Sequence, residues 1–536
     1  MIEIDAGAPA EALAREVARR RTFAIISHPD AGKTTLTEKL LLYAGAVDLA
    51  GAVRARSTQR HATSDWMDME RQRGISITAT ALQFDYEGDR FNLLDTPGHQ
   101  DFSEDTYRTL MAVDSAVMVL DAAKGIEPQT RKLFAVCRQR RIPILTFINK
   151  LDHEGRDPLD LLDEIERTMG IVAAPLNWPI GQGSTFQGVY DLAWGRVLRF
   201  ERTVHGQHRA PVRIAGLHDP VLEASIGGEA CARLRDEVAL LEGAGAAFDR
   251  PAFLDGRLTP VFFGSALTNF GVEPFMRALR ALAPPPGPRA SDRGLVQPTD
   301  AAFAAFVFKV QANMDPRHRD RMAFLRICAG RFEKGMTVQH ARLGRRVSLT
   351  RPYRLFARER ETVEEAYPGD VVGVVNPGLF TVGDTLYTGE PLAFDAIPRF
   401  PPEHFAVLRR PPLSRYKQFH TGVEQLEEEG VIGVLHALDR ARGEPILAAV
   451  GDLQFDVVVA RLRAEYGVET STDRLPYTHA RWITGDPAAV SGMRWTSRGV
   501  LRAVDRQGQP VALFSSVWEL EYCVKENPEV RFHTLG

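Results

Sequence analysis

The chain has 536 residues, of which 44% are hydrophobic and 25% are charged, and its formal net charge is −3. This length supports several hydrophobic cores and about three or four domains. The nearly balanced charge argues against wholesale nonspecific binding to nucleic acid. DNA is therefore not an expected partner, and any RNA contact must come from local basic patches.

Neither the apolar segments nor the cysteines indicate secretion or membrane insertion. No apolar run is long enough for a transmembrane helix. Residues 1–21 mix acidic and basic side chains without an apolar stretch, which predicts a leading helix and not a secretory signal. The widely spaced cysteines favour reduced thiols over disulfides or a metal site, so we expect a cytoplasmic protein. They are Cys137, Cys231, Cys328 and Cys523.

A phosphate-binding loop follows the first predicted strand. Residues 22–26 are apolar and predict a buried strand, and residues 35–42 predict a helix. This order of strand, loop and helix directs backbone N–H groups and a helix N-terminus at phosphates. Lys33 is expected to reach the terminal phosphates and the Thr34 hydroxyl to bind Mg²⁺. The predicted nucleotide-binding residues of this loop are Ser27, His28, Pro29, Asp30, Ala31, Gly32, Lys33, Thr34 and Thr35.

A second segment with the chemistry of a nucleotide site is Asp95-Thr96-Pro97-Gly98, at the end of another apolar run. Asp95 is expected to hold Mg²⁺ through a water, and the Gly98 amide to contact the terminal phosphate. An ordinary Pro-Gly turn after a strand is the alternative interpretation. The phosphate-binding loop upstream favours the nucleotide site.

The segment Asn149-Lys150-Leu151-Asp152 selects the base. Guanine presents two donors, N1–H and the 2-amino group, and the Asp152 carboxylate can accept both. Adenine lacks this pair of donors, so the carboxylate would be left unpaired against ATP, a mismatch that discriminates strongly. Asn149 and Lys150 are expected to brace the base and its loop, and Leu151 completes the segment.

A fourth segment, Gly264-Ser265-Ala266, closes the apolar run 262–263 with small residues. Small side chains at Ser265 and Ala266 would let the backbone approach the guanine carbonyl. A tight turn explains this segment equally well when it is judged alone. The four segments in this order predict a site for GTP and GDP.

His99 follows Gly98 directly, where a side chain can orient a water in line with the terminal phosphate. We predict that His99 is the catalytic residue, in either protonation state. Residues 71–78 are expected to form the first switch, in which Ser76 offers a third ligand to Mg²⁺; the alternative is the start of a strand. Ile75 and Pro29 are candidates for an apolar gate over His99. No arginine finger in cis is evident, so a partner is expected to stimulate slow hydrolysis.

Breaks along the chain predict three domains. Residues 1–285 alternate strands and helices, which is typical of a doubly wound α/β domain, and the long stretch between Asp152 and Phe262 predicts an inserted subdomain. The proline-rich segment 283–288 is the clearest linker. Residues 300–400 contain short strands punctuated by glycines and predict a β-barrel. Residues 403–536 predict an α+β domain.

Three details of the later domains carry expectations of their own. A basic cluster in the first loop of the barrel has two open interpretations, a solvated hairpin tip or a contact with RNA or protein. Residues 453–466 place apolar side chains on one helical stripe, which predicts a core helix. Residues 427–429 are acidic and predict a solvated helix face or end. The basic cluster consists of Arg317, His318, Arg319 and Arg321.

The four nucleotide segments resemble those of the translational GTPases. Within that superfamily the chain resembles the bacterial class II peptide chain release factors, and this resemblance runs from about Arg20 to the C-terminus. Outside the nucleotide site, three segments carry it. They are Asp65-Trp66-Met67-Asp68-Met69-Glu70, Ala312-Asn313-Met314-Asp315-Pro316 and the stretch from Gly451 to Leu462.

The resemblance implies a monomeric factor that binds the ribosome after peptide release and promotes departure of the class I release factor. GTP hydrolysis then lets the factor leave the ribosome. The factor itself neither reads the stop codon nor cleaves the ester that holds the peptide on the tRNA. Elongation factor G is similar in its first domains but carries further C-terminal domains that this chain is too short to hold. Ser76 replaces the usual threonine but keeps the hydroxyl, and Ser27 replaces a glycine, which suggests that no positive φ is needed there.

Three other functions are compatible with parts of this pattern. Another ribosomal GTPase, such as a translocase or a ribosome-protection factor, is disfavoured by the length and the C-terminal segments. A GTP-sensing scaffold without useful hydrolysis is disfavoured by His99 and the magnesium ligands. A P-loop kinase or ATPase is disfavoured by Asp152.

Overall fold

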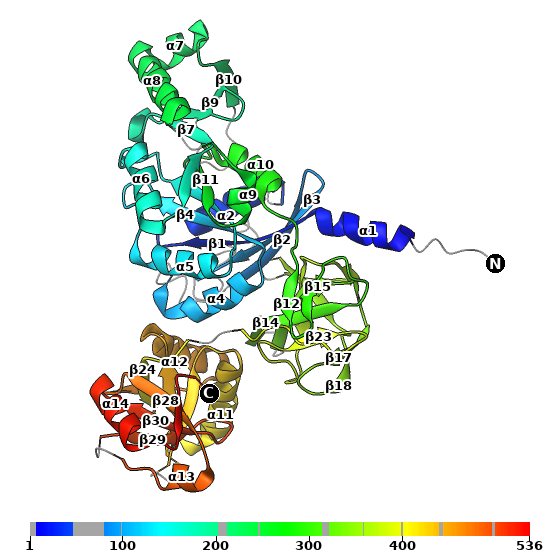
Figure 1. Ribbon diagram of the computed structural model, residues 1–536, viewed down its shortest axis with the longest axis vertical. Helices are drawn as coiled ribbons and strands as arrows, with labels where there is room; N and C mark the ends of the chain where they lie inside the picture. Colours follow the sequence, from blue (N-terminus) through cyan, green and yellow to red (C-terminus); the bar gives the residue numbers. More distant parts are fainter. Residues whose placement is uncertain are drawn as a thin grey trace, which may run out of the picture.

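The computed structural model describes most of the chain in ten stretches (Figure 1). They are residues 7–46, 80–97, 99–201, 212–244, 247–312, 321–356, 359–397, 400–438, 443–495 and 499–535. Helix α1 (Gly7–Ala18) leads into the first strand, as expected of the N-terminus. None of the helices within these stretches is long and apolar enough to cross a membrane.

The N-terminal part is built on a twisted sheet with the strand order β2-β3-β1-β4-β5-β11-β6. Strand β2 is antiparallel to β3, and the other neighbours are parallel. This confirms the predicted doubly wound α/β fold. The strands are β1 (Arg20–Ser27), β2 (Thr80–Tyr86), β3 (Asp89–Asp95), β4 (Ser115–Asp121), β5 (Ile144–Asn149), β6 (Val172–Pro175) and β11 (Leu258–Phe263).

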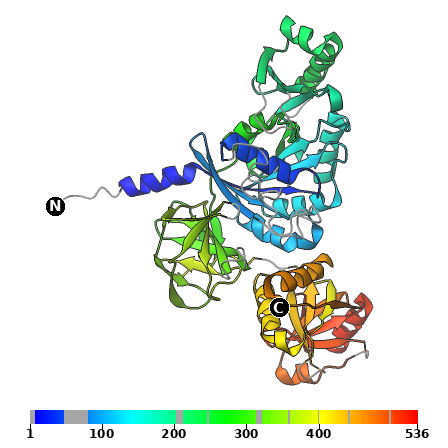
Figure 2. The same cartoon turned by 180° about the vertical axis from the view of Figure 1, so that it is seen from behind.

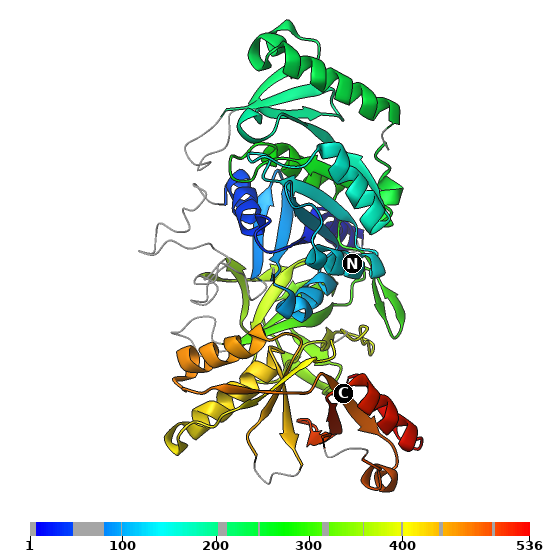
Figure 3. The same ribbon diagram turned by 90° about the vertical axis from the view of Figure 1, so that its left-hand side faces the viewer.

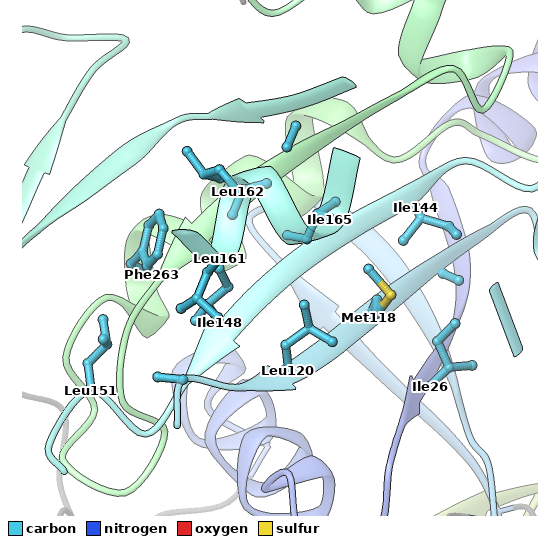
Figure 4. Close-up of a cluster of buried hydrophobic side chains, with 14 of the residues drawn as sticks. Ile26, Met118, Leu120, Ile144, Ile148, Leu151, Leu161, Leu162, Ile165 and Phe263 are labelled. Carbon is cyan, nitrogen blue, oxygen red and sulfur yellow. The ribbon is translucent and has the colours of Figure 1, made fainter. Parts of the chain in front are cut away.

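Helices cover both faces of this sheet because successive strand residues point to opposite sides. In β1, Ala24 and Ile26 belong to the core beneath one group of helices, whereas Phe23 and Ile25 belong to the core on the other face. Figure 4 shows Ile26 in the first of these cores, with Leu161 of α6 beside Ile148 of β5. The helices are α2 (Lys33–Ala44), α4 (Ser103–Met111), α5 (Pro128–Gln139), α6 (Pro158–Met169), α9 (Arg250–Leu254) and α10 (Val272–Leu282).

A separate antiparallel sheet with two helices lies between β6 and α9 in the sequence. It falls within the stretch for which an inserted subdomain is predicted. It stands at one end of the molecule, and the C-terminal part of the chain stands at the opposite end (Figure 2). Its elements are β7 (Asn177–Ile180), β8 (Gly188–Asp191), β9 (Arg196–Phe200), β10 (Val212–Gly216), α7 (Pro220–Ile226) and α8 (Gly228–Ala244).

The proline-rich linker has no regular structure and is followed by a small hairpin that the sequence did not predict. Next comes the β-barrel, whose order is β18-β17-β23-β14-β15-β22-β19-β20, with a separate pair β16-β21. The hairpin strands are β12 (Arg289–Ser291) and β13 (Gly294–Val296). The barrel strands are β14 (Ala304–Ala312), β15 (Arg321–Ala329), β16 (Phe332–Glu333), β17 (Thr337–His340), β18 (Arg345–Ser348), β19 (Pro352–Phe356), β20 (Glu359–Thr362), β21 (Glu365–Ala366), β22 (Val371–Val375) and β23 (Thr385–Tyr387).

Buried polar contacts join the barrel to the start of β1. Arg20 Nε donates a hydrogen bond to Asp370 Oδ2 at 2.9 Å, and both side chains are almost completely buried. Thr22 Oγ1 donates to the carbonyl oxygen of Gly369 at 2.7 Å. Because a buried charge is costly without its partner, these contacts hold the barrel in one orientation against the sheet.

The C-terminal part is α+β, as predicted, with the strand order β27-β24-β26-β25-β29-β30-β28-β31. Helix α12 carries the predicted core stripe, and Phe455, Val458 and Leu462 are completely buried. The helices are α11 (Tyr416–Glu428), α12 (Leu453–Tyr466), α13 (Pro487–Ser491) and α14 (Val517–Glu526). The strands are β24 (His404–Leu408), β25 (Gly433–Ala437), β26 (Ile446–Ala449), β27 (Thr472–Leu475), β28 (His479–Thr484), β29 (Leu501–Val504), β30 (Pro510–Phe514) and β31 (Arg531–His533).

The prediction that residues 427–429 form a solvated helix face is wrong. Glu429 is buried and accepts hydrogen bonds from Arg461 of α12 and from the backbone N–H of Ala312 in the barrel. Glu428 forms an ion pair with Arg321, the one described member of the predicted basic cluster. This acidic segment therefore joins the barrel to the C-terminal part. An isolated run of charges does not show that its partners include Arg461 of another helix and two residues of the barrel more than a hundred positions away.

Glu427 is expected to make the stability of the C-terminal part dependent on pH. Burial raises the pKa of its carboxyl from 4.5 to about 7, although Arg506 and the Val434 amide act in the opposite direction. The folded state therefore holds a proton that the unfolded state releases, so stability falls as pH rises from about 4.5 to 7. Glu427→Gln is expected to remove this cost, with a gain of about 1–3 kcal/mol at pH 8 and little at pH 5.

Thermal unfolding of the full chain at both pH values checks this expectation. Glu424→Gln is a matched control because Glu424 is an exposed residue of the same helix. An equal shift in melting temperature at pH 5 and pH 8 would show that Glu427 does not titrate in this range.

Candidate functional site

The four predicted segments lie at one edge of the central sheet. They follow the carboxyl ends of β1, β3, β5 and β11, and these strands run parallel within the order β3-β1-β4-β5-β11. Crevices at this edge are where sheets of this type bind ligands. Segments far apart in the sequence therefore meet because the strands that precede them are neighbours in the sheet (Figure 1).

The loop after β1 has the backbone geometry of an anion cradle. Ser27 ends the extended strand, so no glycine is needed at this position, as suggested by the sequence. Asp30 and Gly32 have φ values of +67° and +96°, and helix α2 starts at Lys33. Alternation of right- and left-handed residues before a helix aims successive N–H groups at one point. A Cβ atom on Gly32 would lie 2.2 Å from Asn149 Nδ2, so only glycine fits there.

Lys33 and Asp95 form the charged centre of the site. Lys33 Nζ lies 2.5 Å from Asp95 Oδ1, and both residues are buried. Thr96 Oγ1 donates to the carbonyl oxygen of Ile25 at 2.6 Å, which fixes the loop after β3 against β1. Thr34 and Pro29 are half-buried beside them.

Asn149 joins the phosphate-binding loop to the loop after β11. Its Nδ2 donates to the carbonyl oxygen of Ala31 at 2.9 Å, and its Oδ1 accepts from the backbone N–H of Ala266 at 2.8 Å. Both bonds are buried, where unpaired polar groups are costly. Asn149 therefore braces three of the predicted segments, a role that its place in the sequence did not specify.

The carboxylate of Asp152 is oriented by a hydrogen bond from Ser265. Ser265 Oγ donates to Asp152 Oδ1 at 2.6 Å, and the Asp152 side chain is 11% exposed. Leu151 is buried, and its N–H donates to the carbonyl oxygen of Gly264 at 3.3 Å. The structure thus brings the loop of Asp152 together with Ser265 and Ala266.

Asp121 is a residue of this site that the sequence analysis missed. Lys150 Nζ lies 2.9 Å from Asp121 Oδ2, and the Ala123 and Lys124 amides face the other oxygen. Burial raises the pKa of the Asp121 carboxyl, but Lys150 and these amides outweigh it and the net shift is downward. Asp121 ends β4, the strand between β1 and β5, so its position after a fully buried run was the available signal.

His99 lies in the segment between β3 and α4, and its side chain is 33% exposed. In the phosphate-binding loop, His28 Nε2 lies 3.1 Å from Glu127 Oε1. Three predicted residues, Ser76, Ile75 and Gly98, lie outside the described residues. Residues 65–70, which carry part of the family resemblance, also lie outside the described residues. The same is true of residues 313–320, which hold Arg317, His318 and Arg319 of the basic cluster.

Comparison with known proteins assigns the three parts of the chain. Residues 18–285 match the model of the elongation factor Tu GTP binding domain, residues 302–389 that of elongation factor G domain 2, and residues 394–524 that of the class II release factor RF3, C-terminal domain. A crystal structure of a Thermus thermophilus protein has a TM-score of 0.68 at 24% identity. The alignment covers 91% of this chain and 73% of that structure. At this identity the similarity supports the fold alone.

Curated relatives match nearly the whole chain. Peptide chain release factor 3 of Gloeobacter violaceus is 58% identical over 98% of this chain and 99% of its own length. The proteins of the same name from a Cyanothece species and from Symbiobacterium thermophilum are 56% and 55% identical, each over 98% of this chain and over 96% and 99% of their own lengths.

Fold, site and matching domains together define a translational GTPase that binds guanine nucleotide. The near-complete alignment then specifies the member of this class. The chain belongs to the peptide chain release factor 3 family, so the predicted family and GTPase activity are confirmed, and the alternative of another ribosomal GTPase is not favoured.

Proposed function

We propose that this GTPase acts on the ribosome in translation termination. After peptide release it promotes dissociation of the class I release factor, and GTP hydrolysis then allows its own departure. The observation that carries the proposal is the match to the class II release factors across the C-terminal domain, because the nucleotide site alone is common to the superfamily. The factor works as a cytoplasmic monomer and contacts neither DNA nor membrane. Its domains are the GTP-binding domain 1–285, the β-barrel domain 300–400 and the C-terminal domain 403–536.

The nucleotide lies along the edge formed by β3, β1, β5 and β11. Backbone amides of the loop after β1 bind the phosphates, Lys33 moves from Asp95 to the terminal phosphates, and Asp152 accepts from N1–H and the 2-amino group of guanine. Ser265 holds that carboxylate, and Asn149 ties its loop to the phosphate loop. The proposed nucleotide-binding residues are Ser27, His28, Pro29, Asp30, Ala31, Gly32, Lys33, Thr34, Thr35, Asp95, Thr96, Pro97, Gly98, Asn149, Lys150, Leu151, Asp152, Ser265 and Ala266.

The residues beside Lys33 suit Mg²⁺. Carboxylate and hydroxyl oxygens are the ligands that this ion takes, and Asp95 presents a buried carboxylate next to the phosphate-binding loop. Asp95, Thr34 and Ser76 are the proposed ligands. When bound, the ion neutralises charge on the phosphate oxygens.

His99 orients the attacking water. It accelerates hydrolysis by positioning this water, because phosphoryl transfer demands positioning and charge stabilisation more than proton removal. Hydrolysis is slow until the ribosome brings the His99 side chain over the terminal phosphate. The His99 ring is partly exposed, which supports this role.

The test uses ribosomes that carry a labelled class I release factor after peptide hydrolysis. Addition of the protein with GTP is expected to accelerate loss of the label, whereas addition of buffer with GTP is expected to leave the slow spontaneous rate. If the label stays bound while the same protein moves the tRNAs on pretranslocation ribosomes, the chain acts as a translocase and the proposal is wrong.

A further inference from the structure

The loop that carries His99 is covered by the C-terminal domain. Helix α4 and the short helix η2 (Gln100–Phe102) face this domain, which lies beneath the central sheet on the side of α4 (Figures 1 and 3). The guanidinium of Arg108 donates to the carbonyl oxygens of Glu429 and Gly430. The segment that follows the catalytic histidine therefore rests on another domain.

Asp101 contacts both His99 and the C-terminal domain. Its Oδ2 accepts a hydrogen bond from the backbone N–H of Leu453, the first residue of α12, at 2.7 Å. Its Oδ1 lies 3.3 Å from His99 Nδ1, and its backbone N–H also faces Nδ1 at 3.3 Å. The backbone N–H of Asp101 suits an Nδ1 without a proton, and the carboxylate suits an Nδ1 that carries one, so Asp101 can hold the ring in either case.

Phe102 makes a parallel connection through apolar contact. Its ring meets the His99 ring edge-on, with centroids 6.3 Å apart. On its other side Phe102 is buried in a small cluster with Val457 of α12, together with Leu453 and Val431. Two consecutive residues thus link the histidine to the same helix.

We infer that Asp101 is a positioning residue through which the C-terminal domain controls His99. Displacement of α12 relative to the sheet shifts the Asp101 carboxylate, and the imidazole moves with it relative to the terminal phosphate. The partner that triggers hydrolysis then acts by moving the C-terminal domain. This inference rests on the proposed role of His99 in hydrolysis.

Gly451 allows a test from the C-terminal side. A Cβ atom on Gly451 would lie 2.3 Å from Asp101 Cγ, so Gly451→Ala forces the carboxylate to move without altering the nucleotide site. We expect the kcat of ribosome-stimulated GTP hydrolysis to fall by about 10- to 100-fold, because small misplacements of a catalytic group have effects of this size. The affinity for GTP and the ribosome concentration at half-maximal rate are expected to stay within about threefold.

Gly433→Ala is the matched control, since its added Cβ would meet Ala448 Cβ at an ordinary 3.5 Å in the same domain. This variant is expected to hydrolyse GTP like the parent. Asp101→Ala tests the same link from the other side. If one of the two variants fails to fold, the other still tests the link. Asp101→Asn keeps an acceptor for the Leu453 N–H and is expected to retain more activity than Asp101→Ala.

A double-variant cycle separates this inference from the role of His99. In a His99→Ala background, Gly451→Ala is expected to cause no further loss of kcat, because both act on one side chain. A full additional loss would show that Gly451 acts elsewhere and would overturn the inference. If His99→Ala is impaired and Gly451→Ala and Asp101→Ala match the parent, only the inference fails; if His99→Ala matches the parent, the proposed catalytic role fails as well.

Discussion

His99→Ala is expected to lower ribosome-stimulated GTP hydrolysis by about 10²- to 10⁴-fold, the range found when a residue that positions or polarises the attacking group is removed. Nucleotide affinity is expected to change little, because the phosphate and guanine contacts come from other residues. The readout is single-turnover hydrolysis of GTP at saturating ribosome concentration, with nucleotide affinity measured in parallel.

His218→Ala is a suitable control because His218 is an exposed residue of the inserted subdomain, away from the nucleotide edge. Equal hydrolysis by His99→Ala and the parent would refute the assignment of His99. It would also favour a GTP-sensing scaffold in which the histidine has no chemical task.

Asp152→Asn is expected to weaken GTP binding by about 10²- to 10⁴-fold. Two charge-assisted hydrogen bonds to guanine are lost, each worth about 1.5–3 kcal/mol, and the amide nitrogen would face the 2-amino group as a second donor. Xanthine presents a carbonyl oxygen at that position, so xanthosine triphosphate is expected to bind the variant better than GTP does. Competition against a fluorescent guanine nucleotide measures both affinities.

The matched control for this exchange is Asp157→Asn. Asp157 caps helix α6 by accepting from the Leu159 amide, and asparagine caps a helix as well as aspartate does. Retention of GTP selectivity in Asp152→Asn, or equal binding of ATP and GTP by the parent, would contradict guanine recognition by Asp152.

Local patterns were enough to predict a nucleotide site because each segment follows its own buried strand. The run before Ser27 predicted β1, and the same reasoning located Asp95, Asn149 and Ser265 at strand ends. Parallel strands end at the same edge, so the order of the segments was enough to expect that they meet.

Contacts between distant residues were beyond this reasoning. The acidic residues 427–429 read as a solvated helix end, yet Glu429 is buried against Arg461 and the barrel. Asp121 ends a strand, as Asp95 and Asn149 do, but it belongs to no motif, so its ion pair with Lys150 was needed to place it in the site.

The sequence by itself determined the family and the order of the domains, and it predicted the chemistry of nucleotide recognition, because these depend on residue types at short spacings. The tertiary structure alone decided what holds the His99 loop: Asp101 meets the Leu453 amide 352 positions further along the chain. That contact arises from the docking of whole domains, whose orientation depends on buried pairs such as Arg20 with Asp370. The spacing of residues around Arg20, or around Asp370, does not indicate that these two residues meet.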